Sequence, residues 1–516
     1  MKVKKTVGHL FRLLLFVLLA ALLFWAATPV LIPKWSDIWR TTETVRGFYD
    51  LEEDSLDTLI LGTSQVVTGI SAPQLYQEAG IRAYTLGTPR QPMLCSYYYL
   101  RDALRLHPHL KSVVLEVNEL FRLCDDPSYH KALDYMPMSQ VKREAIRERV
   151  NWARQRDAEQ GTDEAPSRLN YLLPLVNYHS RWNELSREDF TVPFSDPHDP
   201  QRGFSIRTTP TVKGLYQPLN TGEPVTYAQP DKEALHFFRA ICALCREKKI
   251  SLVLVKTPRP GWTTPQWTAD KFQTVLSLSR EYDIPYLDFN TVPLLQAIGF
   301  QYRKDILRNS ESHLTLSGAG KLTAYLGDFL TEHCGAEDRR GGPDSAALEA
   351  DLTVYRQRCE DARLPLVTDW RGYLSRLSRR RYSLLIALRA DEAITPSSDN
   401  CPEAFRQVLT QLGLDSRACQ SGHYVAVLEN SRMLAEQWGE GPVSRSAVLA
   451  DGTSCSLASD GDTTLNAVCS IKLGAEEQTI LQSGIQIVVY NHETGTVVDK
   501  AALQFNPLNG GILIVR

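Results

Sequence analysis

The chain has 516 residues, of which 43% are hydrophobic and 23% charged, and its formal net charge is −3. At about 100–200 residues per domain this length predicts two to four domains, and the ordinary composition excludes disordered and collagen-like proteins. The balanced charge gives no general attraction for nucleic acid, so we expect no nucleic-acid partner. The mean hydropathy of −0.25 excludes a polytopic membrane protein but leaves room for a single span.

The N-terminal region contains one long apolar segment. Residues 13–33, LLLFVLLAALLFWAATPVLIP, carry no charge, and these 21 residues can cross a hydrocarbon core of about 30 Å as a helix. Four basic residues and no acidic residue precede the segment. The positive-inside rule therefore predicts a cytoplasmic tail at 1–12, an anchor at 13–33 in the cell membrane, and an extracytoplasmic location for the rest. The alternative is a cleaved signal peptide, for which this apolar region is unusually long.

Residues 45–333 alternate short apolar strands with amphipathic helices. Strands are expected near 58–61, 82–86, 112–117, 251–256 and 285–288, and helices near 94–106, 231–249, 268–282 and 318–330. This alternation predicts an α/β domain, a doubly wound parallel sheet with helices on both faces. Residues 140–230 are less regular and rich in Pro, Arg, Asp and aromatic residues. We expect them to form an insertion over one face of the sheet.

A second domain follows a breaker. Residues 334–344, CGAEDRRGGPD, open a linker and helix at 334–365. Strand-like segments then follow at 383–389, 424–428, 468–473 and 485–490, and Asn491 to Gly495 is typical of a hairpin turn. The sequence therefore predicts a C-terminal β-rich, sandwich-like domain at 366–516.

The ten cysteines leave disulfide pairing open. Cys455 and Cys469 could pair across a hairpin, and Cys401 and Cys419 could also pair. Two further cysteines one helical turn apart, at 242 and 245, are expected to be core thiols. A zinc site would need a second ligand pair, and none is evident, so we expect no metal.

A serine and a histidine stand out for their chemistry. Ser64 follows an apolar strand through Gly62-Thr63, which places it at the carboxyl edge of the parallel sheet, where open α/β sheets keep their sites. His313 lies in a loop just before the last helix of the domain. A serine becomes a nucleophile when a base reaches it, and these two loops can meet in a doubly wound sheet.

Five blocks in order resemble the SGNH (GDSL-like) hydrolase superfamily. They are LILGTSQVVTGISAPQL (59–75), AYTLGTPRQPMLCSYYYLRDAL (83–104), SVVLEVNELF (112–121), PLVNYHSRW (174–182) and SHLTLSGAGKLTAYL (312–326). More narrowly, residues 45–333 look like the membrane-anchored DltD and AlgX/AlgJ-like proteins of cell-envelope polymer acylation. This resemblance implies Ser64 as nucleophile and His313 as base. It also implies an oxyanion hole from the amides of Ser64 and Gly87, with Asn118 as the nearest side-chain donor.

The acid of the family pattern is missing. The family has Asp-x-x-His followed by Leu-Asn, whereas here Ser310 stands three residues before His313 and Thr315 replaces the asparagine. Glu311 or Asp305 could orient the imidazole instead, or a Ser-His dyad could work slowly. A degenerate site that only binds is the alternative. The resemblance implies no metal or diffusible cofactor.

Aromatic residues provide candidate substrate contacts. His179 and Trp182 could line a substrate cleft, or could equally hold the insertion on the sheet. Trp262 and Trp267 lie in a loop after a strand, where exposed tryptophans favour binding.

Residues 366–516 resemble the interleukin-like EMT-inducer (ILEI/PANDER-like) domain. The blocks are YSLLIALRADEA (382–393), FRQVLTQLGL (405–414), GHYVAVLEN (422–430) and SGIQIVVYNHETGTVVDKAALQF (483–505). The family implies a β-rich sandwich linked to carbohydrate recognition or protein contact.

Together these features predict a membrane-anchored, extracytoplasmic O-acyltransferase or esterase. It would act on a cell-envelope polysaccharide or other glycan, with a membrane-bound O-acyltransferase as a candidate partner. The alternative is a non-catalytic, glycan-binding scaffold of a polysaccharide assembly or acylation complex. A signalling ligand, suggested by the C-terminal resemblance, fits a tethered two-domain chain less well.

Overall fold

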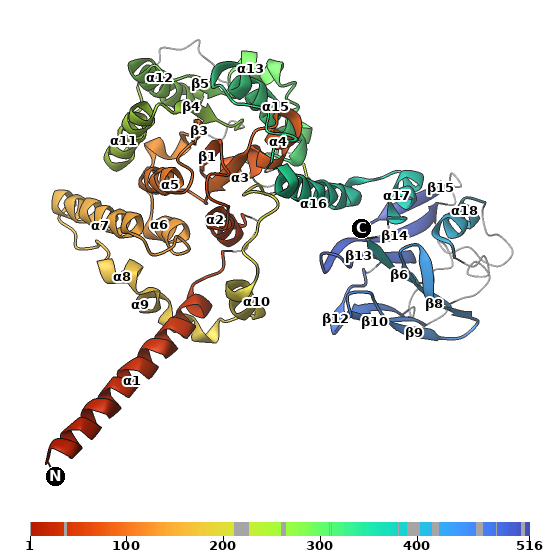
Figure 1. The fold of residues 1–516 in the computed structure, drawn as a ribbon. Coiled ribbons are helices and arrows are strands. Elements are labelled where there is room, and N and C mark those ends of the chain that lie inside the picture. The colour runs from red at the N-terminus through yellow and green to blue at the C-terminus, as the bar shows by residue number, and fades with distance from the viewer. Residues whose placement is uncertain are drawn as a thin grey trace. The chain divides into compact units, whose positions relative to one another are not determined.

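The computed structural model separates the chain into two compact units, Met1–Gln357 and Arg358–Arg516 (Figure 1). It describes all residues except 1, 36–38, 211–226, 260–264, 309, 311, 344, 380, 390–402, 415–422, 461–467, 481 and 507–510. The long helix α16 (Ser345–Arg363) begins in the first unit and ends in the second.

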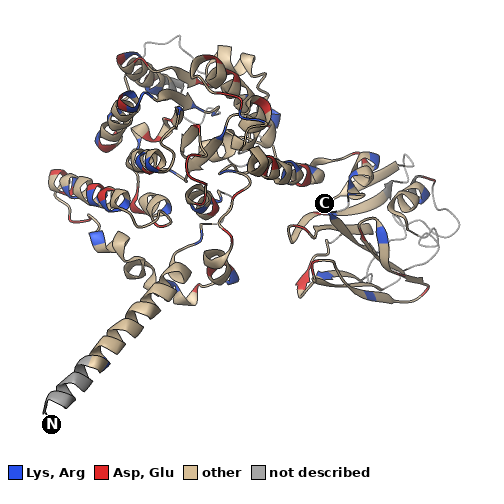
Figure 2. Ribbon diagram, viewed as in Figure 1, with Lys and Arg blue, Asp and Glu red and all other residues tan. Residues whose placement is uncertain are grey.

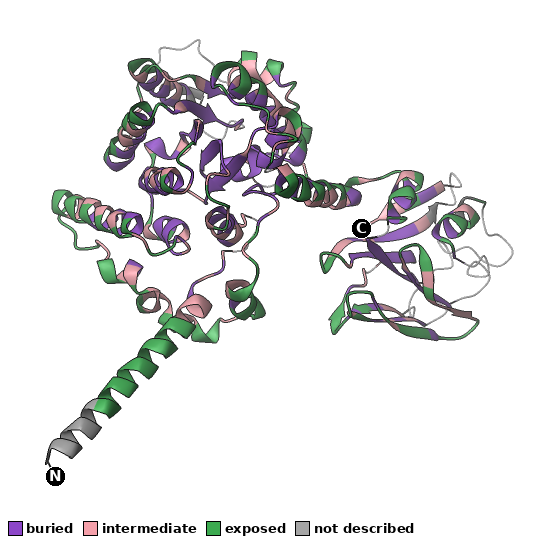
Figure 3. Cartoon of the chain, in the orientation of Figure 1, coloured by how far each residue is buried: buried purple, intermediate pink, exposed green. Residues whose placement is uncertain are grey.

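The chain begins with one long apolar helix. Helix α1 covers Lys2–Leu31, and its stretch Phe11–Leu31 is 21 residues long and apolar enough to cross a membrane. None of that stretch is buried inside the protein, and Figure 3 shows it exposed (green) until its last turns, which are intermediate (pink). Figure 2 shows the same stretch almost free of charged residues, whereas α7 (Gln140–Gln160) carries many of both signs.

A five-stranded parallel sheet forms the centre of the first unit. Its strands are β1 (Thr58–Gly62), β2 (Ala83–Gly87), β3 (Ser112–Glu116), β4 (Ser251–Lys256) and β5 (Tyr286–Asp288), in the order β2-β1-β3-β4-β5. Strands β1, β2 and β3 are buried throughout, as expected for apolar runs covered on both faces. This confirms the predicted mixed α/β architecture with a parallel sheet.

Helices of this unit precede and follow the strands in the sequence and cover the sheet. They include α2 (Thr41–Tyr49), α3 (Ser64–Gly69), α4 (Ala72–Ala79), α5 (Met93–Leu106), α11 (Lys232–Lys248), α12 (Pro265–Tyr282), α13 (Val292–Ala297), α14 (Tyr302–Asp305) and α15 (Leu316–His333). Helix α5 contacts α11, while α15 contacts α3 and α4. The direction of winding changes between β1 and β3, because β2 lies on one side of β1 and β3 on the other. Ligands of such sheets bind at this switch point, outside the carboxyl ends of the strands.

The connection from β3 to β4 is long and helical. Its described part contains η1 (Asn118–Phe121), α6 (Asp126–Leu133), α7, α8 (Arg168–Leu172), α9 (Pro174–Tyr178), η2 (His179–Asn183), α10 (Arg187–Thr191) and η3 (Val192–Phe194). Helix α7 packs on α5, whereas α9, η2 and α10 contact α1. The irregular segment expected at 140–230 therefore includes a set of short helices beside the N-terminal helix.

The second unit is built from two antiparallel sheets. One has six strands in the order β15-β14-β13-β6-β7-β8, and the other has four in the order β12-β11-β10-β9. The strands are β6 (Tyr382–Arg389), β7 (His423–Glu429), β8 (Arg432–Gly439), β9 (Val443–Val448), β10 (Ser454–Asp460), β11 (Val468–Leu473), β12 (Glu476–Glu477), β13 (Gly484–Asn491), β14 (Thr496–Asn506) and β15 (Gly511–Val515). Three helical elements accompany them in the described part of the unit: η4 (Leu364–Leu366), α17 (Trp370–Leu377) and α18 (Glu403–Leu412).

Strand β6 shows how the two faces of this unit are filled. Leu384 and Ile386 belong to a core that includes Trp370 and Val408 from the helices. The alternate residue Leu385 belongs to a second core shared with the four-stranded sheet. Both faces of the strand are thus apolar, because side chains alternate across a sheet. The predicted hairpin turn at 491–495 is confirmed, since Asn491 pairs with Thr496.

The described cysteines are free thiols. The pairing of Cys455 with Cys469 is wrong, because the β10–β11 register puts Cys455 opposite Leu473 and Cys469 opposite Ser459. Cys401 and Cys419 lie outside the described residues.

Candidate active site

Ser64 stands at the carboxyl edge of the sheet. Strand β1 ends at Gly62, Thr63 caps the next helix by accepting a hydrogen bond from the amide of Gln65, and Ser64 is the first residue of α3. The first backbone amides of a helix have no acceptor within the helix, and the Thr63 side-chain oxygen provides one. This cap stabilises the sharp turn from strand to helix. Ser64 therefore lies at the switch point of the sheet, where the connections that follow the paired strands β1 and β3 run in opposite directions.

His313 meets Ser64 from the other end of the domain. The Ser64 Oγ and His313 Nε2 atoms are 2.8 Å apart, although 249 positions separate the two residues. Backbone contacts hold the loop that carries His313. The carbonyl of His313 accepts a hydrogen bond from the amide of Leu307, and the next residue, Leu314, forms an antiparallel bridge with Ile306. Figure 1 shows α3 and α15, which carry or follow the two residues, next to each other. The structure thus brings together the predicted nucleophile and base.

The second ring nitrogen of His313 faces hydroxyl groups. Ser310 Oγ hydrogen-bonds to His313 Nδ1, and Ser312 Oγ lies 3.4 Å from the same atom. A neutral imidazole with its proton on Nδ1 can donate to Ser310 and accept the Ser64 hydroxyl proton at Nε2. Ser310 therefore occupies the place of the orienting acid, with no charge of its own.

No carboxylate of the described residues hydrogen-bonds to His313. Asp305 is not the orienting acid, because its buried carboxylate already accepts from the Gln301 amide, Ser317 Oγ and Lys321 Nζ at 2.6–2.7 Å. It joins the start of α15 to α14, which is a structural role. Glu311, the other substitute considered, lies outside the described residues.

His313 is held in its neutral form. Burial, together with the positive charges of Arg259 and Arg207, lowers the pKa of His313 to about 4, against the effect of a backbone hydrogen bond at Ser310. The Trp39 ring lies 4.3 Å from the imidazole, centroid to centroid, and covers part of it. The imidazole is thus available as a base at neutral pH, but its cation is poorly stabilised.

Two of the three predicted oxyanion donors, Gly87 and Asn118, differ in their surroundings. Gly87 ends β2 directly opposite Gly62. A Cβ at Gly87 would lie 2.8–3.0 Å from Val67, Val66 and the Thr63 carbonyl, so only glycine fits against this turn. Asn118 is engaged elsewhere: its Nδ2 donates to Glu119 at 2.9 Å and its Oδ1 accepts from Arg259 at 3.3 Å.

Sequence reasoning missed Glu116 as a site residue. This buried carboxylate accepts hydrogen bonds from Thr63 Oγ1 at 2.9 Å, from the Thr63 amide at 3.3 Å and from the Asn118 amide at 2.7 Å. Burial raises the pKa of Glu116 to about 7, and the nearby Glu119 adds to the shift. Glu116 joins the turn before Ser64 to the end of β3. The signal in the sequence is a single acid that ends an otherwise apolar strand.

Cations gather on one side of the site. Arg259 follows β4 and is fixed by its amide, which donates to Asn290 Oδ1 at 2.7 Å. Burial lowers the pKa of Lys271 to about 7, and the charges of Lys256, Arg259 and Arg122 act in the same direction. Burial and the charge of Arg122 lower the pKa of Arg259, against the effect of the carboxylates of Glu116 and Glu119.

The predicted substrate-binding residues do not meet the Ser-His pair. His179 and Trp182 belong to η2, which contacts α1 and α9. His179 bonds only locally, through Nδ1 and the Val176 carbonyl, and Trp182 is 73% exposed. Within the described residues neither side chain has a hydrogen bond or ring contact with Ser64 or His313. Trp262 and the side chain of Trp267 lie outside the described residues.

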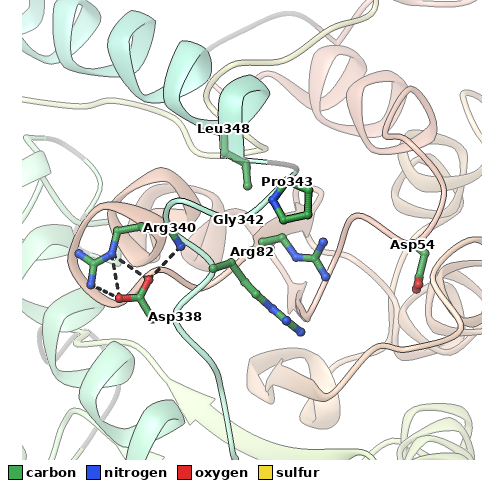
Figure 4. A pocket seen from close by; sticks show the side chains of 8 residues that line it. Asp54, Arg82, Asp338, Arg340, Gly342, Pro343 and Leu348 are labelled. Carbon is green, nitrogen blue, oxygen red and sulfur yellow. Dashed lines mark hydrogen bonds and ion pairs between the residues drawn. The ribbon is translucent and has the colours of Figure 1, made fainter.

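A hollow elsewhere in the unit is lined by ion pairs (Figure 4). Arg82 and Asp57 precede the first residues of β2 and β1, so this hollow belongs to the opposite edge of the sheet from Ser64. Its arginines are paired: Arg82 and Arg339 with Asp57, and Arg340 with Asp338. The Arg339–Asp57 pair joins the segment after α15 to the sheet, and the pairs leave no free cation for a ligand among these arginines.

No protein-family model matches the sequence, and a search of curated proteins found no match.

Proposed function

We propose that this chain is a membrane-anchored, extracytoplasmic O-acyltransferase or esterase of the SGNH-like type. The observation that carries the proposal is the 2.8 Å contact between Ser64 Oγ and His313 Nε2 at the switch point of a parallel sheet. The proposed substrate is an acyl ester of a cell-envelope polysaccharide or another glycan. The α1 segment would be the anchor, with the short basic tail in the cytoplasm.

The geometry supports a two-step acyl transfer. Ser64 Oγ attacks the carbonyl carbon of the ester while His313 Nε2 takes the hydroxyl proton. The amides of Ser64 and Gly87 would stabilise the resulting oxyanion. When the intermediate collapses, the bond between the carbonyl carbon and the leaving oxygen breaks, and His313 returns the proton to that oxygen. A sugar hydroxyl or water then attacks the acyl carbon on Ser64 while His313 takes its proton. The bond between that carbon and Ser64 Oγ breaks, and His313 returns the proton to Ser64 Oγ.

The position of the site relative to α1 is consistent with a membrane-bound partner. Trp39, which covers the His313 ring, follows the last residue of α1 by eight positions. Eight residues span at most about 30 Å. An acyl group delivered at the membrane surface, for example by a membrane-bound O-acyltransferase, would therefore arrive close to Ser64. The C-terminal unit, proposed as an ILEI-like domain, would bind glycan or a protein partner.

One observation favours a second candidate function, a glycan-binding scaffold without catalysis. A hydroxyl cannot stabilise the imidazolium as a carboxylate does, and the charge of Arg259 disfavours that cation further. A site of this kind could bind glycan without catalysing the reaction.

Turnover of p-nitrophenyl acetate by the full chain in detergent distinguishes the two. We expect Ser64→Ala to lower turnover by at least about 100-fold. Ser375→Ala, which removes an exposed hydroxyl of α17 in the second unit, is the matched control and should stay within about threefold. Equal rates for wild type and Ser64→Ala would exclude the nucleophile, and retained glycan binding by both would favour the scaffold.

A further inference from the structure

The segment 168–194, which we call the collar, forms a group of short helices at the end of α1. It contains α8, α9, η2, α10 and η3, and three of these contact α1. Arg181 donates from Nη1 to the carbonyl of Leu31 at 2.6 Å, and Lys34 Nζ lies 3.5 Å from Asp189. These bonds attach the collar to the last residue of the apolar helix, at the level where that helix would leave a bilayer.

The collar exposes large apolar side chains. Six of them are each more than one third exposed, up to 73%: Leu169, Leu173, Val176, Trp182, Phe190 and Phe194. In Figure 3 the short helices at the end of α1 are drawn in green and pink, that is, exposed and intermediate. A soluble domain seldom leaves such a group uncovered within one short segment.

The charges of the collar are balanced. Arg168, Arg181 and Arg187 are matched by Glu184, Glu188 and Asp189, and Arg181 and Asp189 bond to each other. The collar therefore has no net charge to select an anionic surface. Its apolar side chains, with an exposed tryptophan among them, fit the boundary between headgroups and acyl chains.

We propose that the collar rests on the outer surface of the bilayer, with these apolar side chains inserted between lipids. The inference rests on the proposed anchor, because it places the collar by its attachment to Leu31. It assigns Trp182 to lipid contact instead of sugar contact. It also means that the domain is held against the membrane by a second contact and does not swing freely on a single helix.

Quenching of tryptophan fluorescence by brominated lipid tests the proposal. The full chain is reconstituted in phosphatidylcholine vesicles with and without bromine on the acyl chains. Subtracting the emission of Trp182→Phe from that of wild type isolates Trp182. We expect bromine near the headgroups to quench this component by about half, and bromine deeper in the chain to quench it less. A zwitterionic lipid suffices for the effect, because the collar is neutral.

Two further tryptophans separate the anchor from the collar. Trp25, in the exposed stretch of α1, should be quenched if the anchor spans the bilayer. Trp152, whose ring contacts His236 and Phe237, should not be quenched and serves as the matched control. Quenching of Trp25 without Trp182 would overturn the collar proposal alone. Quenching of neither would overturn the anchor as well.

A second variant addresses the apolar side chains themselves. Replacing Phe190 and Phe194 together by serine should reduce the quenching of Trp182, because the collar would sit less deeply. Val292→Ser, which changes an exposed residue of α13, is the control and should have no effect. Unchanged quenching in the double variant would contradict insertion. So would a dimer whose formation protects Trp182 from bromine, since the collar would then bind a second copy.

Discussion

Replacing Ser310 by aspartate should turn the weak Ser-His pair into a stronger base. The side chain at 310 already contacts His313 Nδ1, so a carboxylate there needs no movement of the loop. At about 4 Å and an effective dielectric constant of about 20, the attraction between carboxylate and imidazolium is about 4 kcal/mol. This corresponds to about three pKa units. The pKa of His313, now lowered to about 4, should therefore rise to about 7.

The assay is kcat/KM for p-nitrophenyl acetate between pH 4 and pH 9. Only the neutral imidazole is a base, so the rate rises as pH passes upward through the pKa of His313. We expect this rise near pH 4 in wild type and near pH 7 in Ser310→Asp, with a plateau at least about tenfold higher in the variant. Ser310→Asn, which has the size but not the charge, is the control and should gain nothing. A folded Ser310→Asp with an unchanged profile would refute the assignment of position 310.

Three further predictions concern the surroundings of the pair. Arg259→Gln should raise the pKa of His313 and shift the acid limb of kcat/KM to higher pH; no shift would show that Arg259 exerts no charge effect there. The pKa of Glu116 is raised from about 4.5 to about 7 in the folded protein. The contribution of Glu116 to the free energy of unfolding is therefore fully present below pH 4.5 and is lost as pH rises through 7, a decrease of about 3 kcal/mol. Glu116→Gln should remove this decline in a comparison of melting temperatures at pH 5 and pH 8, and a decline equal to that of wild type would contradict it. Gly87→Ala should lower the free energy of unfolding by about 1–3 kcal/mol in urea titrations, because its Cβ would clash with the turn before Ser64; full stability would contradict this packing.

The local pattern identified the elements that carry the site. The apolar run at 58–61 became a buried strand because its side chains are covered on both faces, and the hairpin turn at 491–495 formed as its residues indicate. Strand order and register follow from contacts distant in sequence. The predicted pairing of Cys455 with Cys469 was wrong for that reason. The register of β10 and β11 keeps the two cysteines apart, and the local sequence does not encode this register.

The site was predictable only in part. The order of the motifs indicated Ser64 and His313, and the structure places them in hydrogen-bond contact. Asp305 was a reasonable substitute acid by its position, but Lys321, one turn into α15, takes its carboxylate. From the sequence, Trp182 is compatible with a contact to sugar or with a contact at the surface. Only its location beside α1 distinguishes the two roles. The role of Glu116 depends on a buried hydrogen-bond network that no spacing reveals.

The central claim is that Ser64 is acylated. Full-length protein is mixed with p-nitrophenyl acetate, quenched with acid, digested and examined by mass spectrometry. We expect one acetyl group on the peptide that contains Ser64, much less in His313→Ala and none in Ser64→Ala. Absence of the acetyl group from that peptide in wild type, or equal acetylation of the same peptide in Ser64→Ala, would contradict the claim.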